Sequence, residues 1–296
     1  MTSQLDTLTR INLDDLVSAF GWEGFPLLSS ILRRVFARPA RQFAEQIIHY
    51  DNLVGELNLA EASQRIMQSR FVHDIRVHGR GHLPASGPVL FLSNHPGMSD
   101  TISLFAAINR PDLRIIAINR PFLEAMKNTA RQLFFIDDDP NKRMNAVRQV
   151  TSHLKNGGAA LTFPAGEIEP DPGVYDGALE SLDNWTDSAA VFLRFVRDTK
   201  IVPVLVSGVI WDRTARHPLT RFKRARAEQE KLAAALQLLI VVTRNARPNT
   251  VHVRFAKPIT LEEVGSTNAQ DIHKFVLERM RGLILNKPKD EGESAL

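Results

Sequence analysis

The sequence predicts an α/β fold in which a mostly parallel sheet is flanked by helices and preceded by a helical segment. Short apolar runs alternate with segments of helical periodicity from residue 74 onward, an order typical of parallel strands joined by helices. The length of 296 residues, 44% of them hydrophobic and 24% charged, suffices for one large core. We expect a helical segment over 1–72, an α/β domain over 73–287 and a disordered tail over 288–296.

The individual elements follow from apolar runs bounded by turn residues. Strands are expected near residues 74–79, 89–93, 113–118, 133–136, 159–162, 201–206 and 251–256. Helices are expected near residues 100–109, 121–131, 142–155, 187–199, 222–242 and 269–285. In an open α/β sheet of this kind, ligands usually bind at the carboxyl ends of the strands.

The N-terminal segment contains an amphipathic stretch over residues 22–36. Its apolar residues recur at helical spacing, and the arginines among and after them are Arg33, Arg34, Arg38 and Arg41. Such a stripe is typical of a helix at a membrane interface, and equally of a helix that packs on its own domain. The sequence leaves both interpretations open. A second helix, from Phe43 to Met67, is expected to pair with the first.

A histidine and an aspartate lie on either side of the turn after the strand at 89–93. His95 ends this strand region, Pro96 and Gly97 mark the turn, and Asp100 opens the next helix. Asp100 can therefore hold one ring nitrogen of His95, leaving the other free to take a proton from a hydroxyl or amine. The alternative is that Asp100 only caps the helix N-terminus.

Three sequence blocks occur in a fixed order around this pair. The first runs from Ile75-Arg76-Val77-His78-Gly79 through Ser93-Asn94-His95 to Asp100, the second is Phe163-Pro164-Ala165-Gly166-Glu167, and the third is Ile201-Val202-Pro203-Val204. Together they resemble the glycerolipid acyltransferase family, the group that contains the 1-acylglycerol-3-phosphate acyltransferases. The second block is similar to the family's F-P-E-G-T-R block. The resemblance implies that His95 and Asp100 are catalytic, with His95 as the general base.

The same blocks indicate where substrate would bind. The residues expected to bind it are Asn94, Gly97, Arg120, Phe163, Pro164, Gly166 and Glu167. If the second block ends a strand next to that of His95, amides near Gly166 would hold the oxyanion and Glu167 would face the same crevice. Arg120 lies where a strand passes into a helix and is expected in that crevice too.

Two departures from the family pattern concern the acceptor. Ala165 and Ile168 stand where the family has a glutamate and an arginine, and the acidic run 137–139 stands where it has a phosphate-binding arginine. We expect this run to form a turn and helix cap, and we predict no metal site. Glu167, Glu169 and these aspartates would suit a cationic or polyhydroxyl acceptor, such as an amino-acid-derived lipid head group.

The overall charge favours an anionic partner. The formal net charge is +4, with a sequence pI near 9.5, and a basic run is formed by Arg213, Arg216, Arg221, Lys223, Arg224 and Arg226. This run suits coenzyme A, an acidic acyl carrier protein or anionic lipid. Two tyrosines and three tryptophans provide no stacking platform for nucleic acid. The absence of cysteine and of an apolar run long enough to span a bilayer fits a cytoplasmic protein that contacts membranes peripherally.

These observations predict an acyltransferase that moves a fatty acyl group from acyl-coenzyme A or acyl carrier protein to a lipid-type acceptor. The acyl carriers are substrates, and no cofactor is expected. Two other functions remain open at this point. One is a catalytically inactive protein of the same fold that binds lipid surfaces, and the other is an acyl-thioesterase in which water replaces the acceptor.

Overall fold

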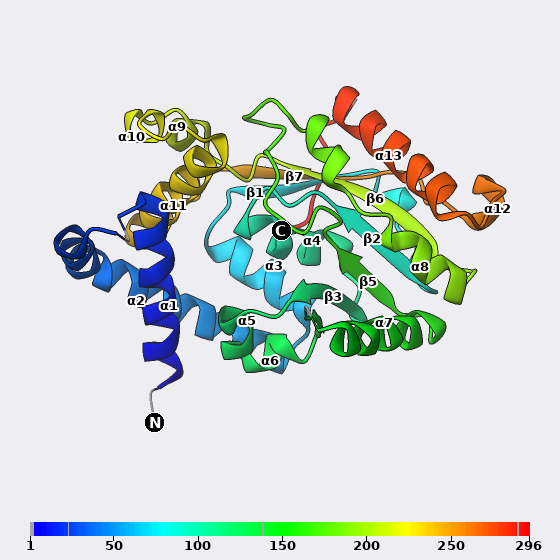
Figure 1. Ribbon diagram of the computed structural model, residues 1–296, viewed down its shortest axis with the longest axis horizontal. Helices are drawn as coiled ribbons and strands as arrows, with labels where there is room; N and C mark the ends of the chain where they lie inside the picture. Colours follow the sequence, from blue (N-terminus) through cyan, green and yellow to red (C-terminus); the bar gives the residue numbers. More distant parts are fainter. Residues whose placement is uncertain (1–2, 23, 138, 289) are drawn as a thin grey trace.

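The computed structural model describes residues 3–22, 24–137, 139–288 and 290–296. Within these residues, eight strands form one sheet in the order β4-β3-β5-β2-β6-β7-β1-β8 (Figure 1). The strands are β1 Asp74–His78, β2 Val89–Ser93, β3 Leu113–Ile118, β4 Leu133–Ile136, β5 Ala159–Thr162, β6 Lys200–Ser207, β7 Thr250–Phe255 and β8 Glu293–Ser294. The five strands from β4 to β6 are parallel, whereas β7 runs antiparallel to β6 and parallel to β1. The predicted fold class is confirmed.

The helices complete the α/β architecture. Those before the sheet are α1 Gln4–Phe20, α2 Pro26–Glu56 and α3 Leu59–Ser69. Those within the domain are α4 Met98–Ile108, α5 Pro121–Ala125, α6 Lys127–Ala130, α7 Pro140–Lys155, α8 Ser188–Phe195, α9 Asp212–Ala215, α10 Pro218–Arg221, α11 Arg226–Arg244, α12 Leu261–Val264 and α13 Ala269–Leu285. The helix expected over 121–131 is divided at Met126, and the one expected over 222–242 begins at Arg226.

The central strand β2 shows why the sheet lies between two layers. All five of its residues are buried, and their alternation directs neighbouring side chains to opposite faces. Val89 and Phe91 join a core with residues of α3 and α4, while Leu90 and Leu92 join a second core with α7, α8 and α13. Burial on both faces explains why this strand is a continuous apolar run in the sequence.

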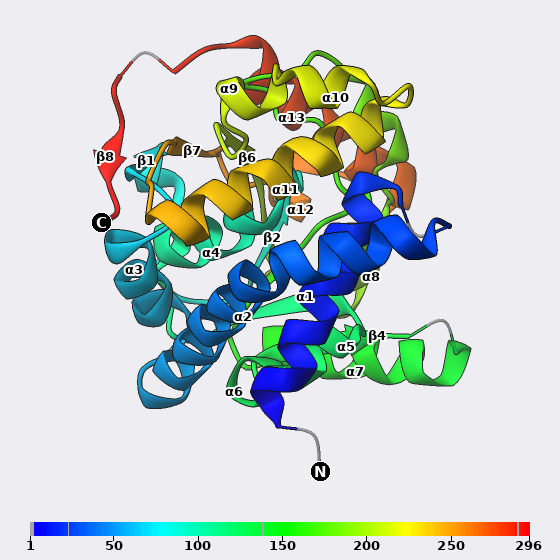
Figure 2. The same ribbon diagram turned by 90° about the vertical axis from the view of Figure 1, so that its left-hand side faces the viewer.

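The N-terminal helices differ from the expected pair. Helix α2 is one continuous element through Pro39, and it packs along α1, with α11 beside both (Figure 2). Pro39 removes one hydrogen bond from the helix, but Ala40, Phe43 and Ala44 around it are buried in the contact with neighbouring helices. The chain breaks instead at Asn58, whose side chain caps α3. The expected helix from Phe43 to Met67 therefore belongs to two helices.

The C-terminal segment is also different from the expectation of a disordered tail. Residues 293–294 form β8, which pairs antiparallel with β1 through Arg76 and Val77. Ser294 Oγ donates to Asp74 Oδ1 at 2.6 Å, and the N–H of Ala295 donates to the carbonyl of Ile75. The open edge of β1 provides unpaired backbone groups, which explains why a polar segment adds to the sheet. In the described part of the chain, no helix combines the length and apolarity needed to cross a bilayer.

Candidate active site

His95 and Asp100 meet in the loop between β2 and α4. His95 Nδ1 donates to Asp100 Oδ2 at 2.8 Å, and the N–H of Gly97 donates to the same oxygen at 2.8 Å. Thr101 Oγ1 donates to Asp100 Oδ1 at 2.9 Å. Asp100 is fully buried and also caps the N-terminus of α4. Asp100 therefore does more than cap the helix, because the same carboxylate also holds the ring of His95.

The surroundings of His95 favour its protonated form. Burial lowers the pKa of His95, but the charge and hydrogen bond of Asp100 and the charge of Glu169 outweigh burial and raise it above the ordinary value. Because Asp100 accepts from Nδ1, the other nitrogen, Nε2, is the one that can take a proton. The imidazolium that would form during proton transfer is stabilised by a buried carboxylate.

A second carboxylate supports the loop from the other side. The N–H of His95 donates to Glu169 Oε2 at 3.1 Å, and the N–H of Glu169 donates to the carbonyl of His95 at 2.9 Å. Glu169 Oε1 accepts from Trp185 Nε1 at 2.8 Å and from Ser181 Oγ at 3.1 Å. Glu169 is 3% exposed and holds the backbone of His95. We had expected its carboxylate to face an acceptor, but burial keeps it from doing so. Its partners come from distant segments, and nothing local in the sequence indicates them.

An apolar cavity of about 410 Å³ opens beside His95. Its walls come from α2, α4, β3, α5 and the segment after β5. The predicted residues Arg120, Phe163, Gly166 and Glu167 all line it. The ring of Phe163 stacks on the imidazole of His95, with centroids 4.3 Å apart. Strand β5 pairs in parallel with β2, so the second block does follow a strand next to that of His95.

Three of the predicted substrate-binding residues instead build the framework of the site. Asn94 is buried, donating through Nδ2 to the carbonyl of Val206 and accepting the N–H of Val206 through Oδ1. Gly97 gives its N–H to Asp100, and the carbonyl of Pro164 accepts from Thr186. None of these three residues is among those that line the cavity, and their polar groups are paired within the chain. Contact of these residues with substrate stays a prediction.

The amides near Gly166, which were expected to hold the oxyanion, differ in their hydrogen bonding. The N–H of Gly166 donates to the carbonyl of Phe163 at 3.1 Å, so it is occupied by the turn. The amides of Glu167 and Ile168 donate to no backbone carbonyl within the residues that the structure describes. These two amides follow Gly166, whose φ of +70° turns the chain there.

The acidic run before α7 forms the predicted turn and cap. Asp139 Oδ1 accepts from the N–H of Asn141 at 2.8 Å at the start of α7, and Lys142 Nζ lies 3.0 Å from Asp137 Oδ2. Asp138 lies outside the described residues. In the described part of the chain, no group of histidine or acidic side chains has the arrangement of a metal site.

Glu169 gives the first testable prediction, which concerns stability. Burial raises the pKa of Glu169 to about 7, although hydrogen bonds from Trp185, Ser181 and His95 oppose the rise. The folded protein therefore binds the proton of the Glu169 carboxyl more tightly than the unfolded chain does. Protonation of Glu169 contributes fully to the free energy of unfolding below the pKa of the unfolded chain, and this contribution is lost as pH rises through about 7. As pH rises from about 5 to about 8, the free energy of unfolding of the wild type should fall by about 2 kcal/mol more than that of Glu169→Gln.

Urea denaturation of both proteins at the two pH values measures this difference. Glu167→Gln is the matched control, because Glu167 is an exposed neighbour and its replacement should leave the pH dependence of the wild type unchanged. If wild type and Glu169→Gln lose stability in parallel, Glu169 is ionised throughout and the assignment is wrong.

Comparison with known proteins identifies the class of enzyme. The family model described as Acyltransferase matches residues 74–207, which contain all three blocks. Among solved structures, the 1-acyl-sn-glycerophosphate (LPA) acyltransferase PlsC from Thermotoga maritima is similar at 17% sequence identity, with a TM-score of 0.43, over 94% of this chain and 97% of that chain. A search of curated proteins found no match. The family match therefore shows an acyltransferase domain over residues 74–207, and the chain is an acyltransferase.

Proposed function

We propose that the enzyme transfers a fatty acyl group from an acyl thioester to the hydroxyl or amine of a lipid acceptor, with His95 as general base and Asp100 as its orienting partner. The observation that carries this proposal is the 2.8 Å hydrogen bond from His95 Nδ1 to a fully buried Asp100, at the edge of an apolar cavity. A base held in this way needs a nucleophile, and an acyl acceptor supplies it.

The reaction would proceed by addition and elimination. His95 Nε2 takes the proton of the acceptor hydroxyl or amine as its oxygen or nitrogen bonds to the thioester carbonyl carbon. The carbonyl oxygen becomes an oxyanion, for which the amides of Glu167 and Ile168 are the candidate donors. The carbon–sulfur bond then breaks, and the imidazolium returns its proton to the leaving thiolate, so that coenzyme A or acyl carrier protein departs as a thiol.

The cavity beside His95 suits the acyl chain of the donor. Its lining is mostly aliphatic and aromatic, from Ile102 and Phe105 on α4 to Ile115 and Ile118 on β3. An apolar chain gains free energy for each methylene group that leaves water. A thioester whose chain enters this cavity would bring its carbonyl group next to His95, which lies on the cavity wall.

The acceptor head group would lie between Arg120 and Glu167, which also line this cavity. Of the acidic residues that we considered for a cationic or polyhydroxyl acceptor, Glu167 is the one that lines the cavity, since Glu169 is buried and Asp137 and Asp139 serve α7. An amine or hydroxyl hydrogen-bonded to Glu167 would fit this pair of charges. We retain an amino-acid-derived or polyhydroxyl head group as the proposed acceptor class.

Mass spectrometry of the products tests the proposal. Purified protein is incubated with a cellular lipid extract and a mixture of acyl-coenzyme A and acyl carrier protein donors, beside the His95→Ala variant. We expect a new acylated lipid that depends on His95 and whose mass identifies the acceptor. Free fatty acid as the only product would indicate a thioesterase, and no turnover by the wild type would indicate a lipid-binding protein without activity.

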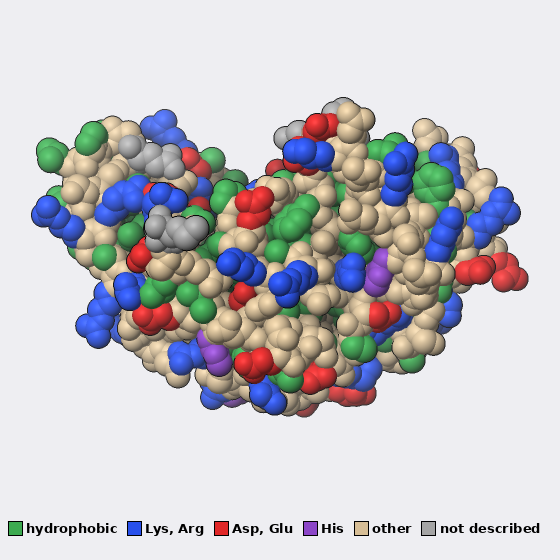
Figure 3. All heavy atoms as spheres, turned by 90° about the horizontal axis from the view of Figure 1, so that it is seen from below, with side chains coloured by type: hydrophobic (Ala, Val, Ile, Leu, Met, Phe, Trp, Pro, Cys, Tyr) green, Lys and Arg blue, Asp and Glu red, His purple; other side chains and the backbone are tan. Residues whose placement is uncertain are grey.

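We further propose that the enzyme works on the surface of an anionic membrane. Phe25 just before α2 is exposed, as are Leu27, Leu28, Ile31 and Val35 in the N-terminal half of α2. Phe222 after α10 is 82% exposed. Lys223 lies beside Gly21, so the end of α10 adjoins the turn between α1 and α2. Figure 3 shows hydrophobic and basic side chains together at this end of the molecule, on the left. Such a combination favours the interface of an anionic bilayer.

Vesicle co-sedimentation measures this contact. Leu27 is 83% exposed, so Leu27→Glu should leave the fold intact while lowering binding to anionic phospholipid vesicles at least about fivefold, because an apolar anchor is lost and a repelled charge is added. Met144→Glu is the matched control, since Met144 is an exposed apolar residue on α7. Equal binding by both variants would show that the N-terminal half of α2 does not touch the membrane.

A further inference from the structure

The segment after β5 contains a second buried carboxylate, Asp171, which the proposed function does not use. It belongs to the sequence Glu169-Pro170-Asp171-Pro172. A residue before proline is restricted to extended backbone, and in an extended chain residues two apart direct their side chains to the same side. Glu169 and Asp171 are accordingly both buried, at 3% and 1% exposure. This segment therefore places two carboxylates in the interior of the protein.

Asp171 binds the loop that follows β6, residues 208–211, which we call the β6 loop. Asp171 Oδ1 accepts the N–H of Gly208 at 2.9 Å, and Oδ2 accepts the N–H of Ile210 at 2.8 Å. Oδ1 also accepts the N–H of Gly173, within its own segment, at 2.8 Å. Hydrogen bonds to an ionised acceptor are stronger than those to a neutral one. One carboxylate thus ties the segment after β5 to the β6 loop.

The β6 loop packs against the turn between His95 and Asp100. A Cβ at Gly97 would lie 3.5 Å from Val209 Cγ1 and 3.9 Å from Ile210 Cδ1, so these two side chains cover the open face of the glycine. The φ of Gly97 is +153°, a conformation that the surrounding structure has to maintain. The N–H of Gly97 and His95 Nδ1 donate to the same oxygen of Asp100. A shift of this turn would therefore reach the hydrogen bond that orients His95.

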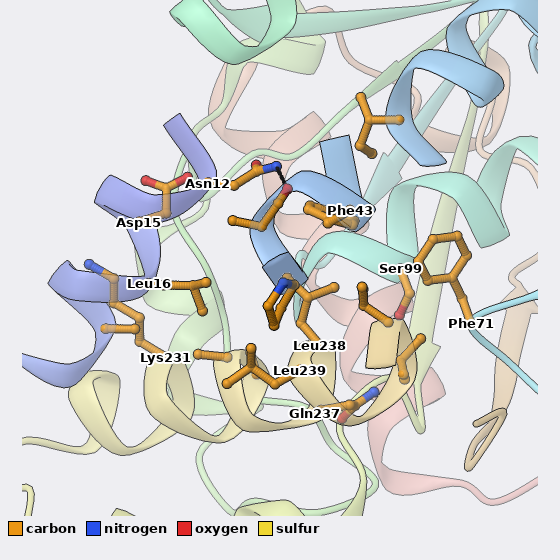
Figure 4. Close-up of a pocket in the computed structure, with 18 of the residues that line it drawn as sticks. Asn12, Asp15, Leu16, Phe43, Phe71, Ser99, Lys231, Gln237, Leu238 and Leu239 are labelled. Atoms are coloured by element: carbon orange, nitrogen blue, oxygen red, sulfur yellow. Dashed lines mark hydrogen bonds between the residues drawn. The ribbon is translucent and has the colours of Figure 1, made fainter. Parts of the chain in front are cut away.

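The β6 loop also borders a cavity. Val209 and Ile210 line a space of about 270 Å³ between α1, α2, α4 and α11, together with Ser99 of α4 and Gln237 of α11 (Figure 4). Side chains next to a cavity lack packing partners on that side. Packing alone therefore does not press the loop onto Gly97, and the hydrogen bonds to its backbone have to keep it there.

We propose that Asp171 is a positioning residue, which clamps the β6 loop against Gly97 and thereby keeps the His95 base oriented. This inference rests on the proposed acyl transfer. Glu169, from the same segment, holds the backbone of His95 directly. Asp171 acts from the other side of the turn, through the β6 loop. One short segment therefore supports the turn from two directions, with a separate carboxylate for each.

Kinetics of Asp171→Asn test the proposal. An asparagine has one amide nitrogen in place of a carboxylate oxygen, so at least one of the N–H groups bound by Asp171 loses its acceptor. The fold should survive, because Gln237 Nε2 and Asn249 Nδ2 still donate to the carbonyl of Val209. At a temperature where the variant is folded, we expect kcat to fall at least about tenfold through misplacement of the base, with KM for the acyl donor nearly unchanged.

Met280→Ala is the matched control for loss of stability. Met280 is fully buried on α13, in the core formed with α7 and α8, and it belongs to the lining of neither the cavity beside His95 nor the one beside the β6 loop. Its replacement should lower the unfolding temperature and leave kcat as in the wild type. If Asp171→Asn retains the kcat of Met280→Ala, the proposal is wrong.

NMR of histidine-labelled protein provides a measurement that does not depend on activity. The proton of His95 Nδ1, bonded to Asp100, should give a downfield signal that is lost in His95→Ala. This signal should move upfield in Asp171→Asn and in Val209→Ala, a milder change that removes the Cγ1 contact with Gly97. Met280→Ala should keep the signal of the wild type. An unchanged signal in either of the first two variants, once folded, would overturn the proposal.

The two measurements also separate this proposal from the proposed function. If the wild type transfers no acyl group to any acceptor, the proposed function fails, and the NMR signal still shows whether Asp171 orients His95. If the wild type is active while Asp171→Asn keeps both its rate and its signal, the positioning role fails and acyl transfer stands.

Discussion

His95→Ala is expected to lower kcat for acyl transfer at least about a thousandfold, because the acceptor then has no base to take its proton. The fold should survive the change. Without the imidazole, Asp100 still accepts from the N–H of Gly97 and the hydroxyl of Thr101, so no buried carboxylate is left without partners. Initial rates of product formation, together with thermal unfolding of both proteins, measure the two effects.

His49→Ala provides the matched control for this prediction. His49 is exposed on α2, so its replacement should change neither kcat nor the unfolding temperature. Acyl transfer by His95→Ala at a rate near that of the wild type would overturn the assignment of the base. Loss of activity together with a large fall in the unfolding temperature would instead indicate a structural role for His95.

The strands could be predicted accurately because burial on both faces leaves a clear local pattern. The bounds of β2, β3, β4 and β5 are the predicted ones, and those of β1, β6 and β7 differ by one residue at one or both ends, since each strand is an apolar run ended by Gly, Pro or polar residues. The direction of β7 has no such signal, because apolar alternation is the same in a parallel and an antiparallel strand. The two-residue strand β8 is polar, and it forms only because the edge of β1 is open.

The contact between His95 and Asp100 was predictable for a similar reason, since the two residues are close in the sequence. The residues that support the pair are distant. Glu169, which accepts from Trp185, reaches His95 only because β5 pairs with β2. Asn94 is bonded to Val206 on β6. Single-sequence patterns do not show which distant polar groups will pair, so Asn94 was assigned to substrate and Glu169 to the acceptor. The framework of a site is therefore less predictable than the reacting groups it holds.

Asp100→Asn is expected to separate the charge of Asp100 from its geometry. An asparagine can place its oxygen where Oδ2 accepts from His95 and Gly97, and turn its amide toward the Thr101 hydroxyl, which can accept as well as donate. His95 would then keep its orientation while losing the negative charge that stabilises its imidazolium. We expect kcat to fall by about two to four orders of magnitude.

The pH profile of Asp100→Asn shows whether the negative charge of Asp100 acts on His95 during the reaction. A general base must be neutral, so kcat/KM of the wild type should rise with pH through the pKa of His95, which Asp100 and Glu169 raise against the effect of burial. With the Asp100 charge removed, burial prevails and the pKa of His95 falls, so the rise in kcat/KM should move to lower pH although the maximum is much smaller. Thr101→Val, which removes one hydrogen bond to Asp100 and no charge, should leave the position of the rise nearly unchanged. A profile of Asp100→Asn that rises at the same pH as the wild type would mean that His95 does not titrate in this step, and that the carboxylate serves the loop and the cap of α4 alone.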